Sequence, residues 1–135
     1  MRRLTKKLAD DVRGSSAVEF ALSAGILVLM LVGIAQVGIL FMANAGLRHA
    51  VGEGARLSTI FPAPDDAAIV AKVTSARFGV NPAYITDGGP QVTRGTENGA
   101  DFTEVTMTYS VPLNFIFFQI PGVTLTETRR AFAGS

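Results

Sequence analysis

The stretch that decides the fold is AGILVLMLVGIAQVGILFMA, residues 24–43, in which Gln36 is the one strongly polar side chain. No charged residue occurs from Phe20 to Leu47. A helix of this length extends roughly 40 Å at about 1.5 Å per residue, which is enough to cross a hydrocarbon core of about 30 Å. The sequence therefore predicts a single transmembrane helix. The alternative is the buried helix of a soluble domain, but the roughly 90 other residues could not build a core around it.

The charges outside this stretch are unevenly placed. Asp10 and Asp11 oppose five basic side chains that precede it, which are Arg2, Arg3, Lys6, Lys7 and Arg13. Because short flanking segments rich in lysine and arginine stay in the cytoplasm, we expect the N-terminus inside and Ser135 outside. Topology and contact with anionic lipid explain the basic cluster, so it does not require a nucleic-acid partner.

The composition excludes several kinds of chemistry. No cysteine is present, so disulfides, thiolate catalysis and thiolate metal sites are excluded. His49 and Glu53 are too few ligands for a metal, and we interpret them as a helix-surface pair. A single histidine next to the membrane gives no credible catalytic triad. We therefore expect no enzyme activity, no metal and no cofactor.

After the apolar stretch, the sequence predicts a longer helix and then a short one. Helical character should continue to residue 61, until Pro62 and Pro64 end it. Asp65 and Asp66 are N-cap candidates for an amphipathic helix from about residue 66 to 78, closed by Gly79. Its apolar residues recur four and three apart, at Ile69, Val73 and Ala76.

Alternating residues then predict an antiparallel sheet. The clearest strand is 102–111, whose apolar side would hold Val105, Met107, Tyr109 and Val111. Residues 91–94 could be its hairpin partner across the Asn98-Gly99 turn, and residues 123–132 could form a last strand antiparallel to this first one. The apolar connection LNFIFFQIPG, residues 113–122, could pack between strand and helix, dip into the membrane or bind a partner.

The expected organisation is therefore a basic leader at residues 1–14, a long helix at 15–61 and a small head domain at 62–135. The helix would span the membrane at about residues 20–45. The fold class is α+β: a long N-terminal transmembrane helix, then a small extracytoplasmic domain with one short helix and an antiparallel sheet. A head of this size is only marginally stable alone, so it should pack against the long helix.

The segment RGSSAVEF, residues 13–20, joins the leader to the apolar stretch. Gly14 is the last residue before that stretch, Glu19 lies five residues later, and Phe20 follows. A glutamate at the mouth of a transmembrane helix is unfavourable unless it has a partner or a role. The alternative is a hydrated carboxylate at the headgroups that does nothing.

Small residues recur at four-residue spacing just inside this junction, at Ala17, Ala21 and Gly25. Such a stripe lets another helix approach closely, so it is a candidate helix-packing face. Small residues also occur in transmembrane helices that have no partner, and that alternative stays open.

The junction resembles the type IV prepilin signature, in which a prepilin peptidase cuts after a glycine and leaves the apolar helix on the mature subunit. The resemblance implies cleavage between Gly14 and Ser15. It also places Glu19 at the fifth mature position, where the family has an assembly residue, with Phe20 beside it. The new ammonium at Ser15 could meet the Glu19 carboxylate of a neighbouring subunit, which would fix register more than affinity.

A closer resemblance narrows the family. The run VEFALSAGILVLMLVGIAQVG, residues 18–38, is similar to the TadE/TadF-like minor pseudopilins of tight-adherence (Flp, type IVc) pilus systems. The segment HAVGEGAR, residues 49–56, resembles that family's Ala-x-x-Glu-Gly-Ala-Arg. Gly25 and Gln36 depart from the pattern, because the family often has proline and a second glutamate at these places.

The resemblance implies a single-pass pseudopilin of the cytoplasmic (inner) membrane that initiates or supports a type IVc pilus by helix–helix association. Implied partners are the prepilin peptidase, other pilin or pseudopilin subunits, the pilus assembly platform and membrane lipid. Two alternatives remain. Ala43-Asn44-Ala45 mimics a signal-peptidase site, which would give a secreted domain beginning at Gly46. An uncleaved signal anchor would instead carry a small binding domain outside the membrane.

Overall fold

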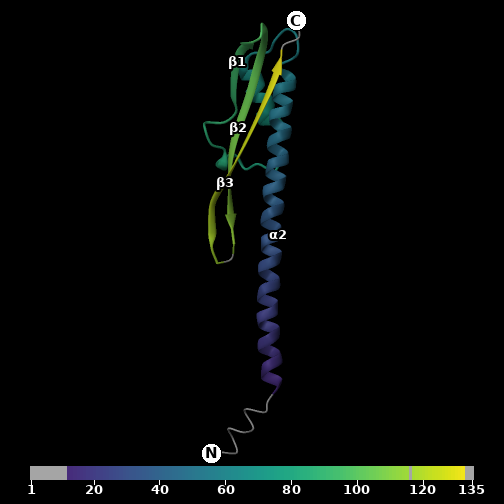
Figure 1. Cartoon of the computed structure of the whole chain (residues 1–135), viewed down its shortest axis with the longest axis vertical. Helices are drawn as coiled ribbons and strands as arrows, with labels where there is room; N and C mark the ends of the chain where they lie inside the picture. Colours follow the sequence, from purple (N-terminus) through teal and green to yellow (C-terminus); the bar gives the residue numbers. More distant parts are fainter. Residues whose placement is uncertain (1–11, 116, 133–135) are drawn as a thin grey trace, which may run out of the picture. The chain divides into compact units, whose positions relative to one another are not determined.

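The computed structural model describes residues 12–115 and 117–132, with the backbone alone for residues 12–15. Its elements are, in order, α2 (Val12–Leu57), α3 (Asp66–Ala76), the 3-10 helix η1 (Pro82–Tyr84), β1 (Gln91–Glu97), β2 (Ala100–Asn114) and β3 (Gln119–Phe132). The predicted α+β class, with one long apolar helix, one short helix and an antiparallel sheet, is confirmed (Figure 1). The chain divides into two compact units, residues 1–35 and 36–135, and α2 contributes to both. Most of the predicted leader, residues 1–11, lies outside the described residues.

Helix α2 ends at Leu57, before the prolines that the sequence suggests as its end. The hydroxyl groups of Ser58 and Thr59 each donate to the carbonyl oxygen three residues earlier, at 2.7 and 2.8 Å. The amide of Thr59 also donates to the carbonyl oxygen of Arg56, at 3.3 Å, which tightens the last turn. Serine and threonine side chains compete for helix carbonyl groups in this way, so these hydrogen bonds accompany the end of the helix a few residues before Pro62.

The sheet has the strand order β1-β2-β3, with β2 in the centre. Its first hairpin turns at Asn98 and Gly99, whose φ angles of 53° and 81° match the two-residue turn that fits the twist of paired strands. β1 is longer than the four residues the sequence suggests, because it pairs with β2 up to Glu97 opposite Ala100. β3 runs antiparallel along β2, as Figure 1 shows in yellow and green.

The second hairpin extends into the apolar segment 113–122. Leu113 pairs with Ile120 and Asn114 pairs with Gln119, so these residues continue the strands instead of forming a separate connection. The amide of Phe115 donates to the carbonyl oxygen of Phe118 at 2.9 Å and closes the turn. This apolar end of the β2–β3 hairpin, residues 113–115 and 117–120, is called the hairpin tip below.

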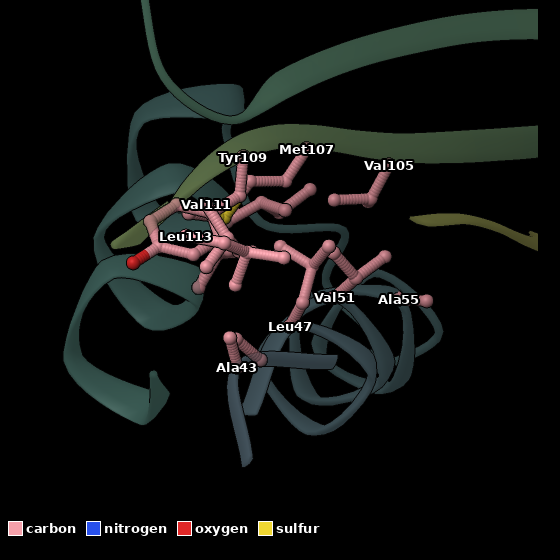
Figure 2. Close-up of a cluster of buried hydrophobic side chains, with 12 residues drawn as sticks. Ala43, Leu47, Val51, Ala55, Val105, Met107, Tyr109, Val111 and Leu113 are labelled. Atoms are coloured by element: carbon pink, nitrogen blue, oxygen red, sulfur yellow. The ribbon is translucent and has the colours of Figure 1, made fainter. Parts of the chain in front are cut away.

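The core lies between β2, α3 and the C-terminal part of α2 (Figure 2). From Thr103 onward every second side chain of β2 is buried, as its alternation predicts, and the apolar ones are Val105, Met107, Tyr109, Val111 and Leu113. α2 contributes buried residues at helical spacing, namely Ala43, Leu47, Ala50, Val51 and Ala55. Ile69 and Val73 of α3 complete the cluster and confirm the predicted apolar face. The head therefore gains its core from the helix, as expected for a domain too small to form one alone.

Helix α3 begins where the aspartates predict. The Asp65 carboxylate caps the helix by accepting a 2.7 Å hydrogen bond from the amide of Ala68. The Asp66 carboxylate accepts a 2.7 Å hydrogen bond from Nε of Arg94, which ties α3 to β1. Arg94 also donates to the carbonyl oxygen of Pro64 at 2.7 Å. The segment between the two helices is thus held against the first strand.

Candidate functional site

The predicted cleavage site lies at the start of α2. The described part of α2 begins at Val12, so the backbone of Gly14 and Ser15 is helical. A peptidase that cuts after Gly14 would need this backbone to unwind. Glu19 and Phe20 follow about one turn later, and both side chains are exposed, Phe20 at 75%.

The two candidate assembly features lie on opposite sides of the helix. Ala17, Ala21 and Gly25 form one exposed stripe, and a Cβ placed on Gly25 would meet no described atom within 4 Å. At about 100° per residue, Glu19 lies about 160° around the helix from the centre of this stripe. One neighbouring helix therefore cannot cover both features. They suit contacts with two different neighbours.

Within the part of the chain that the structure describes, one helix is long and apolar enough to cross a membrane, over Ser16–Leu57. Large apolar side chains are exposed along it, including Leu22, Ile26, Leu27, Met30, Ile34 and Phe41. A helix that is apolar on its exposed surface is typical of a membrane span. The predicted transmembrane helix thus has a match in the structure, as a candidate membrane anchor near the N-terminus.

A second face of small residues packs α2 against the head. This face was not predicted from the sequence. A Cβ on Gly46 would collide with the carbonyl oxygen of Phe78, and a Cβ on Gly54 would collide with Cγ2 of Val73. The signal was present in the sequence, because small residues recur three and four apart at Ala43, Gly46, Ala50 and Gly54. The glycines at 46 and 54 are required by the close approach of the loop after α3 and of α3 itself.

The segment 49–56 is structural. Glu53 pairs with Arg56 at 3.1 Å and with Lys72 of α3 at 3.4 Å. It does so in place of the predicted surface pair with His49, whose ring lies against Phe78 with 5.7 Å between centroids. Among the described residues no group of three or more potential metal ligands occurs. The segment thus fixes α3 on α2.

An arginine braces the exposed face of the sheet. Arg130 on β3 pairs with Glu97 on β1 at 2.7 Å and with Glu104 on β2 at 2.9 Å. Its guanidinium carbon lies 4.1 Å from the ring centroid of Phe102. The hydrogen bond to Glu104 raises the pKa of Arg130, so the guanidinium stays charged. This cluster links all three strands and was not predicted.

Comparison with protein families gives one finding. Residues 14–56 match the family model described as TadE-like protein. The matched segment includes the predicted cleavage glycine, Glu19, the small-residue stripe and the segment 49–56, whereas the sheet lies beyond it. The comparison with curated proteins and the comparison with solved structures found no match. The resemblance to TadE-like proteins is confirmed, and together with the candidate span it supports a membrane-anchored, Tad pilus-associated protein.

Proposed function

We propose that this chain is a pseudopilin of a type IVc (Flp/Tad) pilus, matured by a prepilin peptidase between Gly14 and Ser15, with a structural role and no catalysis. The observation that carries the proposal is the exposed Glu19, five residues after Gly14 at the mouth of the candidate span and inside the TadE-like match. A carboxylate there is unfavourable without a partner. Cleavage supplies one, because it creates an ammonium group on every mature subunit.

Assembly would proceed through the two opposite faces of the N-terminal helix. The stripe of Ala17, Ala21 and Gly25 lets one neighbouring helix approach closely, so that van der Waals contact stabilises the pair. The opposite face presents Glu19 to the Ser15 ammonium of a second neighbour. Both ions must lose water before they pair, so the net gain is small and the main effect is a fixed axial register.

The proposed orientation places the leader in the cytoplasm and the head outside. Its support is the basic flank of the apolar stretch. Protease added to spheroplasts should cut the exposed turn at Asp87 or the one at Asn98. A folded, inserted head that resists this protease until the membrane is opened would reverse the orientation.

The secreted alternative meets a difficulty in the packing of α2. A signal-peptidase cut after Ala45 would fall inside the continuous helix. It would also divide the buried face, because Ala43 and Leu47 on either side of the cut are 0% and 1% exposed. The head would then lose part of the surface that completes its core. This favours a mature chain that keeps the whole helix.

The deciding experiment is the mature N-terminus. The chain is co-expressed with its cognate peptidase, and intact mass or N-terminal sequencing identifies the first residue. We expect Ser15. Gly14→Leu should block cleavage, because the family's site accepts little more than a small side chain, whereas Gly25→Leu in the same helix should leave it intact. A start at Gly46 would indicate the secreted domain, and an intact Met1 would indicate the signal anchor.

A further inference from the structure

We propose that the hairpin tip enters the outer leaflet of the bilayer and forms a second membrane contact beside α2. This inference rests on the proposed membrane span and orientation, and it does not depend on a role in pili. The occupant of the apolar surface would be lipid, at the boundary between headgroups and acyl chains. Two features of the tip support this: its exposed apolar side chains and its level along α2.

The tip is apolar and exposed. Phe117 is 78% exposed, Phe118 is 58% exposed and Ile120 is 40% exposed. Phe115 stacks on Phe118 with 4.8 Å between ring centroids, so these two rings form a small aromatic cluster. No charged residue occurs from Val105 to Thr126. Exposed aromatic clusters of this kind mark surfaces that contact a membrane or another protein.

The position of the tip along α2 indicates that its neighbour is the membrane. The Gln36 amide nitrogen Nε2 lies 2.8 Å from the carbonyl oxygen of Asn114, which places the base of the tip at Gln36. Gln36 lies inside the uncharged stretch, about 13 Å before the predicted outer end of the span near residue 45, at about 1.5 Å per residue. A tip at this level meets the outer leaflet if the helix crosses the bilayer there. The neighbour that surrounds such a helix on most sides is lipid.

The backbone of the tip is paired along the inner side of its two strands only. The ladder pairs Leu113 with Ile120 and Asn114 with Gln119, and the turn closes with the 2.9 Å hydrogen bond from Phe115 to Phe118. Pro112 and Pro121 at its base have no amide hydrogen to satisfy. Unpaired backbone groups are strongly unfavourable in hydrocarbon. Because β1 pairs with β2 only as far as Thr106, the outward-facing groups of the tip must stay hydrated, which places it at the headgroup boundary. The polar pair Asn114 and Gln119 limits it to a shallow depth.

Single tryptophans can test the insertion, because the chain contains none. The full chain is reconstituted into phosphatidylcholine vesicles, with iodide on both sides of the bilayer or with brominated acyl chains. Phe117→Trp reports on the tip. Leu27→Trp marks the span, and Phe61→Trp, at a site that is 95% exposed beyond the end of α2, marks the aqueous side.

We expect brominated lipid to quench Phe117→Trp and Leu27→Trp but not Phe61→Trp. Iodide quenching of Phe117→Trp should be severalfold weaker than that of Phe61→Trp. If iodide reaches positions 117 and 61 equally while position 27 stays protected, the tip is in water and the inference is wrong. Protection of position 117 from both quenchers would also overturn it, by indicating a protein neighbour. Iodide access at position 27 would mean that the span itself, and the proposed function with it, fails.

Phe118→Trp provides a second reporter if the Phe117 variant does not fold. Circular dichroism and the unfolding temperature of each variant identify misfolded samples before quenching is measured. Because Phe118 stacks on Phe115, its substitution keeps an aromatic ring in the same cluster. Agreement between the two reporters is expected, and iodide access at both in folded protein would overturn the inference.

Discussion

The side-chain amide of Gln36 donates a 2.8 Å hydrogen bond to the carbonyl oxygen of Asn114, which joins α2 to the base of the hairpin tip. Gln36 is the one strongly polar residue in the stretch that decides the fold. An ionised glutamate, which the resembling family often has there, carries no N–H and could not make this bond. The departure at residue 36 therefore has a structural reason in this chain.

Gln36→Leu should loosen the hairpin tip. It leaves the Asn114 carbonyl without its partner at an exposed site, and the loss of such a hydrogen bond costs about 0.5–1.5 kcal/mol. Hydrogen exchange should become faster in residues 113–120 and stay unchanged in the buried part of β2 around Met107. Gln36→Glu should behave similarly at neutral pH and recover protection in acid, where the protonated carboxyl can donate. Unchanged exchange in Gln36→Leu would show that the bond does not hold the tip.

Gly54→Ala should destabilise the head, although alanine is the better helix former. The new Cβ would collide with Cγ2 of Val73 and lie 3.5 Å from Cγ1 of Val105, in a fully packed core. Overpacking costs about 1–3 kcal/mol, which exceeds the gain in helix propensity of about 1 kcal/mol. Gly52→Ala is the matched control, because a Cβ there meets nothing within 4 Å and should stabilise the chain. Thermal unfolding of the full chain in detergent micelles measures both, and equal shifts would disprove the close packing at residue 54.

Arg130→Gln should change stability little, despite its two ion pairs. Exposed ion pairs contribute little to stability, and salt screens them. Met107→Ala, by contrast, empties a site that is 1% exposed and should cost about 2–5 kcal/mol. Urea unfolding at low and high salt compares the two variants. A large, salt-insensitive loss for Arg130→Gln would mean that the brace organises the sheet.

Local signals explain what could be predicted from the sequence. The uncharged stretch, the Asp65 cap, the Asn98-Gly99 turn and the alternation along β2 each act over a few residues, so the corresponding elements match. The strands of the hairpin tip were harder to predict, because consecutive apolar residues hide the alternation of apolar and polar positions. At the end of α2, hydroxyl groups hydrogen-bond to carbonyl oxygens before the prolines are reached, and the positions of the prolines alone do not predict this.

Contacts between distant residues lie beyond what local patterns can predict. Arg130 meets Glu97 and Glu104 only once the register of three strands is fixed. Gly54 requires that α3 cross α2 at that turn, although its spacing from Ala50 could have suggested a close contact. In the candidate site, by contrast, Gly14 and Glu19 are predicted from position alone, because the boundary between leader and apolar stretch is a sequence feature, and their roles stay predictions.

A rival partner for Glu19 exists within its own chain. Glu19 follows Ser15 by four residues, so the two lie on the same side of a helix one turn apart. Helix side chains tilt toward the N-terminus, which brings the carboxylate toward the new ammonium of the same mature chain. Such a pair would stabilise the first turns of the helix but would not join subunits. Only a measurement of association separates the two possibilities.

Glu19→Ala should leave membrane insertion and cleavage intact while weakening association with other pilin-like subunits, because insertion depends on the apolar stretch. Glu19→Gln should weaken this association similarly. The glutamine keeps the shape of the side chain but lacks the charge that offsets a partly buried ammonium. Ser16→Ala, a change at an exposed residue of the same helix end, is the control and should assemble normally. Site-specific crosslinking to partner subunits and a count of surface pili measure the effect. Wild-type crosslinking and piliation in both Glu19 variants would leave only the in-chain pair or a hydrated carboxylate, and Glu19 would then no longer support an assembly role.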